Sequence, residues 1–173
     1  MIKVQVPATS ANMGPGFDTM GIALSMHNIL QLEETEKDII VDIVGREQEP
    51  QQLINPCHHL IVETIKNVFD LVGKPVKGLH LICENTIPFT RGLGSSSAAI
   101  VSGLFGANAL LKNPFTREEL IKIAVDLEGH PDNVLPAICG GFTVAAVLPN
   151  GVRYVKCEVP PSMQAVVAME QLL

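Results

Sequence analysis

One glycine- and serine-rich stretch carries most of the information in this sequence, and it reads Pro88-Phe89-Thr90-Arg91-Gly92-Leu93-Gly94-Ser95-Ser96-Ser97-Ala98. Residues 98–111 follow at once and are almost wholly apolar or small, which is typical of a helix buried on all sides. Glycines let a backbone approach a ligand closely, and the first turn of a helix offers amides and a partial positive charge. The stretch therefore predicts an anion site, and we interpret it as a phosphate-binding loop.

Two plainer interpretations of this stretch are a flexible linker and an ordinary helix cap. A linker is disfavoured because Leu93 sits inside the stretch and an apolar helix follows it directly. The pattern also lacks the GK[ST] ending of a Walker A loop, and it is not GxGxxG. If the loop holds phosphates, we expect a side chain introduced at Gly94 to block their approach.

Length and composition set the outer limits of the interpretation. The 173 residues suit one domain, or one domain and the beginning of another. The formal net charge of −6 argues against a general nucleic-acid binder, which needs clustered Lys and Arg. No apolar run reaches the ~20 residues of a membrane span, and the N-terminus is strand-like rather than a signal peptide. We therefore expect a cytoplasmic protein that binds neither nucleic acid nor membrane.

The four cysteines are far apart and form no CxxC pair, so we expect reduced, buried thiols. They are Cys57, Cys83, Cys139 and Cys157. The run Cys57-His58-His59 invites a metal interpretation, which we disfavour because no second ligand pair stands at zinc spacing.

The remaining pattern predicts strands and helices without regular βαβ alternation, which indicates the α+β class. Expected strands cover 2–6, 21–32, 39–44, 78–84, 140–148, 152–159 and 164–168, with a tight turn at 149–151. Expected helices cover 56–72, 98–111 and 116–128, the last opened by a capping box, and a short one begins at Asn133. Residues 7–18 are expected as an ordered loop and 45–53 as a polar surface connection.

Two further segments hold polar groups suited to chemistry. In the loop that runs to Asp18, the side chains of Asn12 and Asp18 could grip an ammonium group or orient a hydroxyl, although both types also favour turns. In the run 128–133, Glu128 suits Mg²⁺, and Asp132 or Asn133 could hold an acceptor hydroxyl. The alternative for that run is helix termination with Asp132 as the next N-cap.

The three segments together resemble the GHMP family of small-molecule kinases. The phosphate-loop stretch is similar to the second family motif, and 128–133 followed by Gly140-Gly141 is similar to the region that joins the metal and acceptor sites. The stretch Pro7-Ala-Thr-Ser-Ala-Asn-Met-Gly-Pro-Gly-Phe-Asp18 resembles the first motif in the form found in homoserine kinases. The match in order and spacing runs from residue 2 to about residue 168.

The resemblance implies a domain like the second domain of ribosomal protein S5 over residues 1–160, with 161–173 beginning a C-terminal domain that is largely missing. It implies ATP and Mg²⁺ as cofactors. The implied reaction, a step of threonine biosynthesis, converts ATP and L-homoserine into ADP and O-phospho-L-homoserine. Residues 88–98 would hold the nucleotide, with Gly92 to Ala98 around the phosphates.

Further roles are implied for single residues. Ser96 and Glu128 would hold Mg²⁺, and Asn133 would position the attacking hydroxyl. Asp132 stands where mevalonate kinases have a proposed base, although direct attack without a base is favoured for homoserine kinases. The residues implied for homoserine are Asn12, Asp18 and His130.

Other interpretations stay open at this point. The chain could be another GHMP kinase acting on a different alcohol, an inactive fragment, or an RNA-binding module of the same fold. Members of the family are much longer, so the chain is expected to be part of a longer protein, and a homodimer stays open as its assembly.

Overall fold

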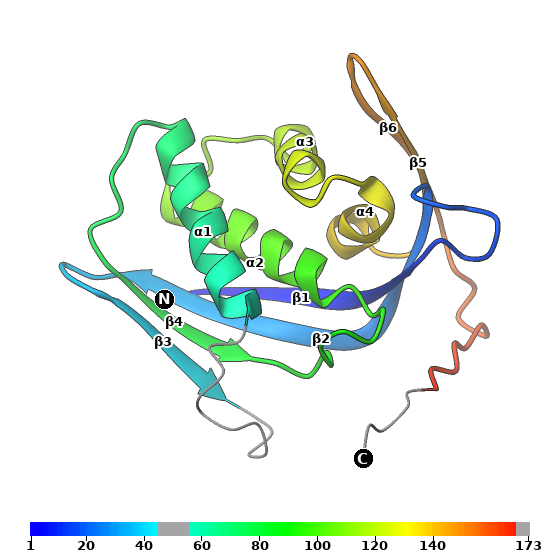
Figure 1. Cartoon of the computed structure of the whole chain (residues 1–173), viewed down its shortest axis with the longest axis horizontal. Coiled ribbons are helices and arrows are strands. Elements are labelled where there is room, and N and C mark those ends of the chain that lie inside the picture. Colours follow the sequence, from blue (N-terminus) through cyan, green and yellow to red (C-terminus); the bar gives the residue numbers. More distant parts are fainter. Residues whose placement is uncertain (45–55, 169–173) are drawn as a thin grey trace.

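The computed structural model describes residues 1–44 and 56–168, and Figure 1 shows one mixed sheet with the helices gathered on one of its faces. The strands are β1 (Ile2–Ala11), β2 (Met20–Glu34), β3 (Ile39–Val44), β4 (Leu79–Glu84), β5 (Phe142–Leu148) and β6 (Gly151–Cys157). The helices are α1 (Pro56–Leu71), α2 (Ser95–Leu110), α3 (Arg117–Glu128) and α4 (Pro131–Cys139). The expected α+β class is confirmed.

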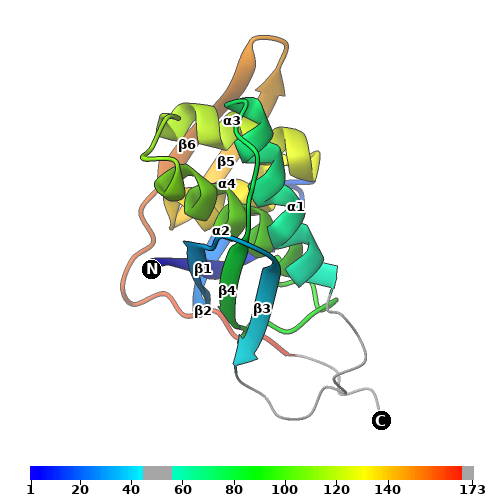
Figure 2. The same cartoon turned by 90° about the vertical axis from the view of Figure 1, so that its left-hand side faces the viewer.

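The long strand β2 organises the sheet. It pairs with β1 along one edge, while β4 and β5 share its other edge at opposite ends of the strand. The order is β3-β4-β2-β5-β6, with β1 off this path, and among the strand pairs of the described residues only β3 and β4 run parallel. Figure 2 shows α1 and α2 lying over β1, β2 and β4. The helices thus pack on one face of the sheet, which fixes the positions of their ends (Figure 1 and Figure 2).

Helix α2 forms the centre of the core. Most of its residues are buried, as the apolar pattern predicted, and it packs against α1, α3, α4, β1 and β2. At Gly103 a Cβ would lie 2.8 Å from the carbonyl oxygen of Ile61, so the glycine lets α1 approach α2 closely. Because α2 is enclosed along its length, its first turn is the part that can meet a ligand.

Several predicted boundaries are corrected by the structure. β1 continues to Ala11, because residues 7–11 pair with β2 instead of forming a loop. Helix α2 begins at Ser95, three residues before the predicted start. Residues 164–168 are exposed and form no strand, since no described strand pairs with them. The predicted connection at 45–53 lies outside the described residues, and the division at residue 160 stays a prediction.

The expectation of buried thiols holds only in part. Cys83, Cys139 and Cys157 are all free, but only Cys83 is buried, while Cys157 at the end of β6 is exposed. The side chain of Cys57 lies outside the described part of the structure. Within the described residues, none of the helices combines the length and the apolar character that crossing a bilayer requires.

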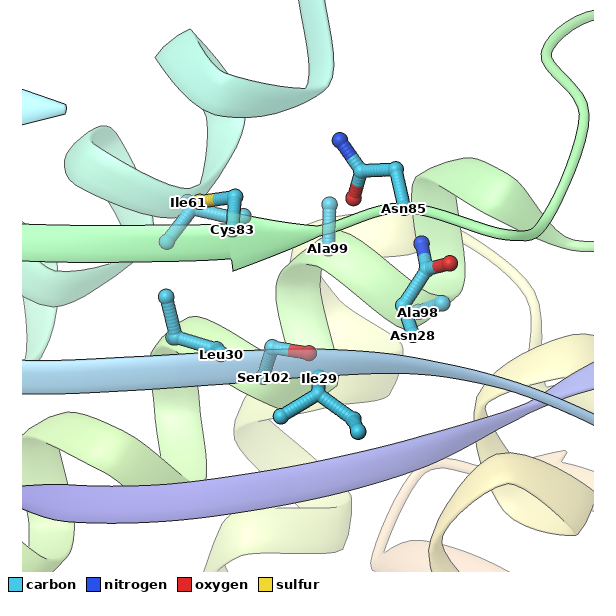
Figure 3. Close-up of a pocket in the computed structure, with 9 residues that line it drawn as sticks. All are labelled: Asn28, Ile29, Leu30, Ile61, Cys83, Asn85, Ala98, Ala99 and Ser102. Atoms are coloured by element: carbon cyan, nitrogen blue, oxygen red, sulfur yellow. The ribbon is translucent and has the colours of Figure 1, made fainter. Parts of the chain in front are cut away.

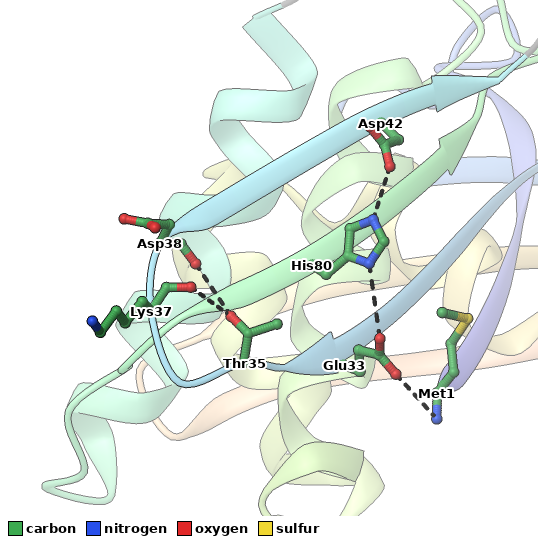
Figure 4. Close-up of polar contacts among 7 residues, drawn as sticks. All are labelled: Met1, Glu33, Thr35, Lys37, Asp38, Asp42 and His80. Atoms are coloured by element: carbon green, nitrogen blue, oxygen red, sulfur yellow. Dashed lines mark hydrogen bonds and ion pairs between the residues drawn. The ribbon is translucent and has the colours of Figure 1, made fainter.

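The face of the sheet opposite the helices carries a charged cluster around His80 of β4 (Figure 4). Its Nε2 lies 2.8 Å from Asp42 of β3, and its Nδ1 lies 3.8 Å from Glu33 of β2, which also faces the N-terminal amine of Met1 at 3.9 Å. The hydrogen bond to Asp42, with a smaller contribution from Glu33, raises the pKa of His80 above its usual 6.5. Protonated His80 thus links three strands.

This cluster makes stability depend on pH. A pKa raised in the folded state stabilises the protein below pH 6.5, and the benefit is lost as pH rises through the folded pKa. We therefore expect His80→Gln to lower the free energy of unfolding at pH 5.5 and to have a smaller effect at pH 8, in urea titrations. His27→Gln on β2 is the control, and an equal effect of His80→Gln at both pH values would contradict the account.

Candidate active site

The first turn of α2 has the open geometry that a phosphate loop requires. The helix begins at Ser95 behind Gly94, which takes a left-handed conformation with φ of +67° and, as a glycine, has no side chain to cap the helix. Arg91, Gly92 and Ser96 are exposed, whereas Leu93 anchors the loop in the core. The first amides of a helix have no acceptor within the helix, so they are directed at this surface. The loop is neither sealed in the core nor extended.

Three segments that are far apart in the sequence meet at Gly94. The hydroxyl of Thr9, at the end of β1, donates to Oδ1 of Asn133 on α4 at 2.7 Å. The Thr9 amide donates to the carbonyl of Leu93 at 3.1 Å. A Cβ on Gly94 would stand 2.0 Å from the Thr9 hydroxyl oxygen and 3.1 Å from Asn133 Oδ1. The phosphate loop is therefore in direct contact with both of the other segments.

The sequence predicted that a side chain at Gly94 would block the approach of phosphates, and this contact gives a different reason why a side chain is not tolerated there. A side chain there would strike Thr9 before it reached a phosphate, because the missing Cβ points into the protein. At Gly92, by contrast, a Cβ would meet nothing within 4 Å, although φ is +69°. Gly94 thus serves the packing of the site, and Gly92 leaves the open side of the loop clear.

The carboxylate of Glu128 lies beside the same helix turn, at the C-terminal end of α3. Ser96 Oγ donates to its Oε2 at 3.0 Å, and Ser97 Oγ donates to its Oε1 at 2.7 Å. Ser97 is fully buried and Ser96 is exposed, so one hydroxyl orients the carboxylate while the other faces the surface. A hydroxyl and a carboxylate at the mouth of an amide-lined loop are the hard oxygen donors that Mg²⁺ prefers. The donor set fits the expected metal.

A second polar cluster brings Asp18, His130 and Asp132 together, with their ligand atoms all within 4.8 Å of one another. His130 Nδ1 donates to Asp132 Oδ1 at 2.5 Å, and Asp132 is only 1% exposed, whereas Asp18 is exposed. A Cβ at Gly21 of β2 would lie 1.7 Å from the Asp132 carbonyl oxygen, so strand and helix are in close contact here. Two carboxylates around one imidazole make this corner suited to a cation.

The start of α4 differs from the prediction. Its N-cap is His130 in an extended conformation, followed by Pro131, so Asp132 is inside the helix and does not cap it. Proline is favoured at the first helical position because its missing N–H would be unpaired there anyway. The early start turns the Asp132 side chain into the cluster with His130 instead of onto its own backbone.

In the loop from Asn12 to Asp18, the Asn12 side chain stabilises a turn, which was the alternative to a ligand-binding role. Asn12 has φ of +68°, and its side-chain oxygen accepts from the Asp18 amide at 3.0 Å. Its backbone also bonds to Met20 and Gly16, which closes the loop. Since its oxygen is used inside the loop, the side-chain NH₂ is the group that Asn12 can offer to a ligand.

A small pocket lies on the sheet side of the first turns of α2 (Figure 3). Its lining residues are Asn28, Ile29, Leu30, Ile61, Cys83, Asn85, Ala98, Ala99 and Ser102. Asn28 Oδ1 accepts from the amides of Thr86 and Ile87, which holds the segment leading into the phosphate loop. Burial raises the pKa of the Cys83 thiol to about 12, so it stays neutral. This pocket has mostly apolar walls and no charged lining residue, unlike the polar surface at residues 94–97.

All the single residues predicted as catalytic, substrate-binding or metal-binding thus lie at one end of α2 or in the adjoining cluster. Two contributions were missed. Thr9 stood in the predicted loop without a role, and Ser97 was not recognised as a partner of Glu128. The β1–β2 ladder is irregular between Pro7 and Thr9, so the neighbours Ala8 and Thr9 are both buried. Regular strand alternation gives no signal for such an irregularity.

Comparison with known proteins shows which proteins this chain resembles. Residues 59–141 match the family model described as the GHMP kinases N terminal domain. Over these residues the chain is therefore similar to the N-terminal domain of GHMP kinases. Curated relatives at 44–45% identity are homoserine kinases, and the chain spans about half the length of these relatives.

Three of these relatives illustrate the similarity. The homoserine kinase of Petrotoga mobilis is 45% identical over 164 residues, which cover 95% of this chain and 53% of that protein. The homoserine kinase of Carboxydothermus hydrogenoformans is 44% identical over 170 residues, covering 98% of this chain and 55% of that protein. A solved structure described as a homoserine kinase from Listeria monocytogenes is 34% identical with a TM-score of 0.76, covering 98% of this chain and 61% of that one.

The two loop glycines allow the contact at Gly94 to be isolated. Alanine at either position adopts a left-handed backbone, which costs about 1–2 kcal/mol. Gly94→Ala also drives a methyl group into Thr9, so we expect it to lower the free energy of unfolding by a further ~1–3 kcal/mol relative to Gly92→Ala. Urea unfolding of the two variants measures the difference, and equal losses would show that the close contact is absent.

Proposed function

We propose that this chain is the ATP-binding half of a homoserine kinase, which transfers a phosphoryl group from ATP to the hydroxyl of L-homoserine and gives ADP and O-phospho-L-homoserine. Support comes from the match to the GHMP kinase N-terminal domain, from similarity at 44–45% identity to two homoserine kinases, and from the geometry of the site. The reaction belongs to threonine biosynthesis, and because ATP is the donor we place it in the cytoplasm.

The phosphates of ATP would bind at residues 92–98, with the flanking residues 88–91 completing the nucleotide site. The amides at the start of α2 and the partial positive charge of its N-terminus suit the β- and γ-phosphates. Ser96 and Glu128 would hold Mg²⁺, with Ser97 keeping the carboxylate in place. When bound, the ion supplies charge neutralisation on the transferred phosphoryl group and the leaving oxygen.

The observation that carries the choice of acceptor is the anionic corner next to this cationic helix end. Asp18 is exposed and free to meet a ligand, and Asp132 beneath it is buried and bonded to His130. An ammonium group fits there, with Asp18 as its counter-charge and with His130 and the Asn12 NH₂ as neighbouring polar contacts. Homoserine carries such a group, whereas a neutral sugar or mevalonate does not.

Asn133 would orient the attacking hydroxyl, since it lies between the anionic corner and Gly94. Phosphoryl transfer passes through a loose transition state, so positioning and charge stabilisation supply most of the catalysis. Asp132 already accepts from His130 and is buried, which favours a supporting role over that of a general base. A dedicated base is therefore not required by this arrangement.

The metal assignment is tested by Glu128→Gln. Loss of the negative charge should reduce the Mg²⁺-dependent part of ATP affinity about tenfold or more, while affinity measured without Mg²⁺ changes little. Titration calorimetry with and without Mg²⁺ measures both. Asp126→Asn, an exposed acid two residues earlier on α3, is the matched control. If Mg²⁺ strengthens ATP binding equally in the wild type and in Glu128→Gln, the carboxylate is not a ligand.

The acceptor assignment is tested by Asp18→Asn. Asparagine tolerates the φ of +53° at this position, so the change removes charge without added backbone strain. We expect KM for L-homoserine to rise about tenfold or more with KM for ATP unchanged, because only the ammonium contact is lost. Asp38→Asn is matched in conformation, with φ of +60°, and lies between β2 and β3, away from the site.

Steady-state formation of ADP from ATP by the full-length protein that contains this chain, with L-homoserine, mevalonate or galactose as the acceptor, measures these constants and tests the proposal as a whole. Turnover of mevalonate or galactose without turnover of L-homoserine would overturn the choice of substrate, and would favour another kinase of the same family.

A further inference from the structure

We propose that Thr9 is a positioning residue, which fixes the orientation of the Asn133 side-chain amide and so aims its NH₂ at the acceptor hydroxyl. This inference rests on the proposed function, because it assigns Thr9 a part in the same phosphoryl transfer. Its basis is the hydrogen bond from Thr9 Oγ1 to Asn133 Oδ1 at 2.7 Å, which joins residues 124 positions apart.

Thr9 is held rigidly enough to act in this way. Its side chain is fully buried, and its amide donates to the Leu93 carbonyl at 3.1 Å, so the strand end is tied to the phosphate loop. The irregular ladder between Pro7 and Thr9 directs the side chain inward at a place where regular pairing would not. Threonine also has few rotamers, since it is branched at Cβ. The donor is thus fixed before any ligand binds.

An asparagine amide has two chemically opposite ends, and its neighbours decide which end faces a ligand. The Thr9 hydroxyl can give its single proton to only one acceptor, and it gives it to Oδ1. Asn133 is half-buried, so the NH₂ end is the one left to meet a substrate oxygen. Without the hydroxyl, the amide could turn over and present an acceptor where the reaction needs a donor.

The same hydroxyl also couples the acceptor side of the site to the phosphate side. Its oxygen is packed against Gly94, where a Cβ would stand only 2.0 Å away. Gly94 is the residue from which α2 and its amides begin. Through this contact, the Thr9 hydroxyl, which orients Asn133, keeps a fixed position relative to the amides that would hold ATP. Phosphoryl transfer depends on that relative position of the two substrates.

The test is a double-mutant cycle with Thr9→Val and Asn133→Ala, measured on the turnover of L-homoserine by the full-length protein that contains this chain. Valine keeps the shape of threonine and removes the hydroxyl, so we expect kcat to fall on the order of 10²-fold with KM for ATP unchanged. In the Asn133→Ala background, Thr9→Val should have little further effect, because Thr9 acts through that amide. Thr9→Ser keeps the hydroxyl and should retain most of the wild-type kcat.

A readout independent of turnover is the pair of Asn133 side-chain NH₂ signals in a ¹⁵N–¹H NMR spectrum, assigned by their loss in Asn133→Ala. We expect them to shift in Thr9→Val and to stay close to the wild type in Thr9→Ser. Thermal unfolding of each variant checks that it is folded.

Two results would overturn the inference. One is an equal loss of kcat from Thr9→Val in both backgrounds, which a merely structural role produces. The other is Asn133 NH₂ signals that do not respond to Thr9→Val. A full-length wild-type protein that does not turn over L-homoserine would instead refute the proposed function, and the NMR comparison would still decide whether Thr9 orients the Asn133 amide.

Discussion

The structure of the site depends on one close contact, in which the backbone of Gly94 lies against the Thr9 hydroxyl and the Asn133 side chain. The left-handed glycine turns the chain into α2, and the absence of a Cβ lets three distant segments meet. Helix α2 is enclosed by α1, α3, α4 and the sheet. Its N-terminus, which carries the partial positive charge, is therefore the part that a ligand could contact. The sheet and helices serve to bring these polar groups to the mouth of one buried helix.

Around that contact the charges separate into two regions. On one side, the helix N-terminus with its amides suits phosphate, and Glu128 with Ser96 offers oxygen ligands to a cation that would accompany it. On the other side, Asp18, Asp132 and His130 suit a positively charged acceptor. Asn133 contacts Gly94 and follows Asp132 in the chain, so in the proposed reaction it would lie where the hydroxyl and the transferred phosphoryl group meet. In the proposed reaction, the charges would therefore place the anionic donor on one side of Asn133 and the cationic acceptor on the other.

Much of this could be predicted from sequence, because the signals were local. The apolar run of α2, the capping box at Thr116 and the turn at 149–151 each have a period or a turn chemistry of their own, and all three are confirmed. The irregular pairing at Thr9 and the early start of α4 at Pro131 were not predicted, since both depend on contacts between distant segments. For the same reason, the sequence predicted individual residues of the site but not the residues that hydrogen-bond to them. Glu128 was predicted, whereas its buried hydrogen-bond donor Ser97 was not.

The central claim is that the amides at the start of α2 receive the phosphates of a nucleotide. A crystal structure of the protein with Mg²⁺ and a non-hydrolysable ATP analogue tests it most directly. The account predicts β- and γ-phosphate oxygens within hydrogen-bonding distance of the amides of residues 94–97, with the metal ion between Ser96 and Glu128. A nucleotide bound elsewhere on the protein, with these amides facing only water, would contradict it.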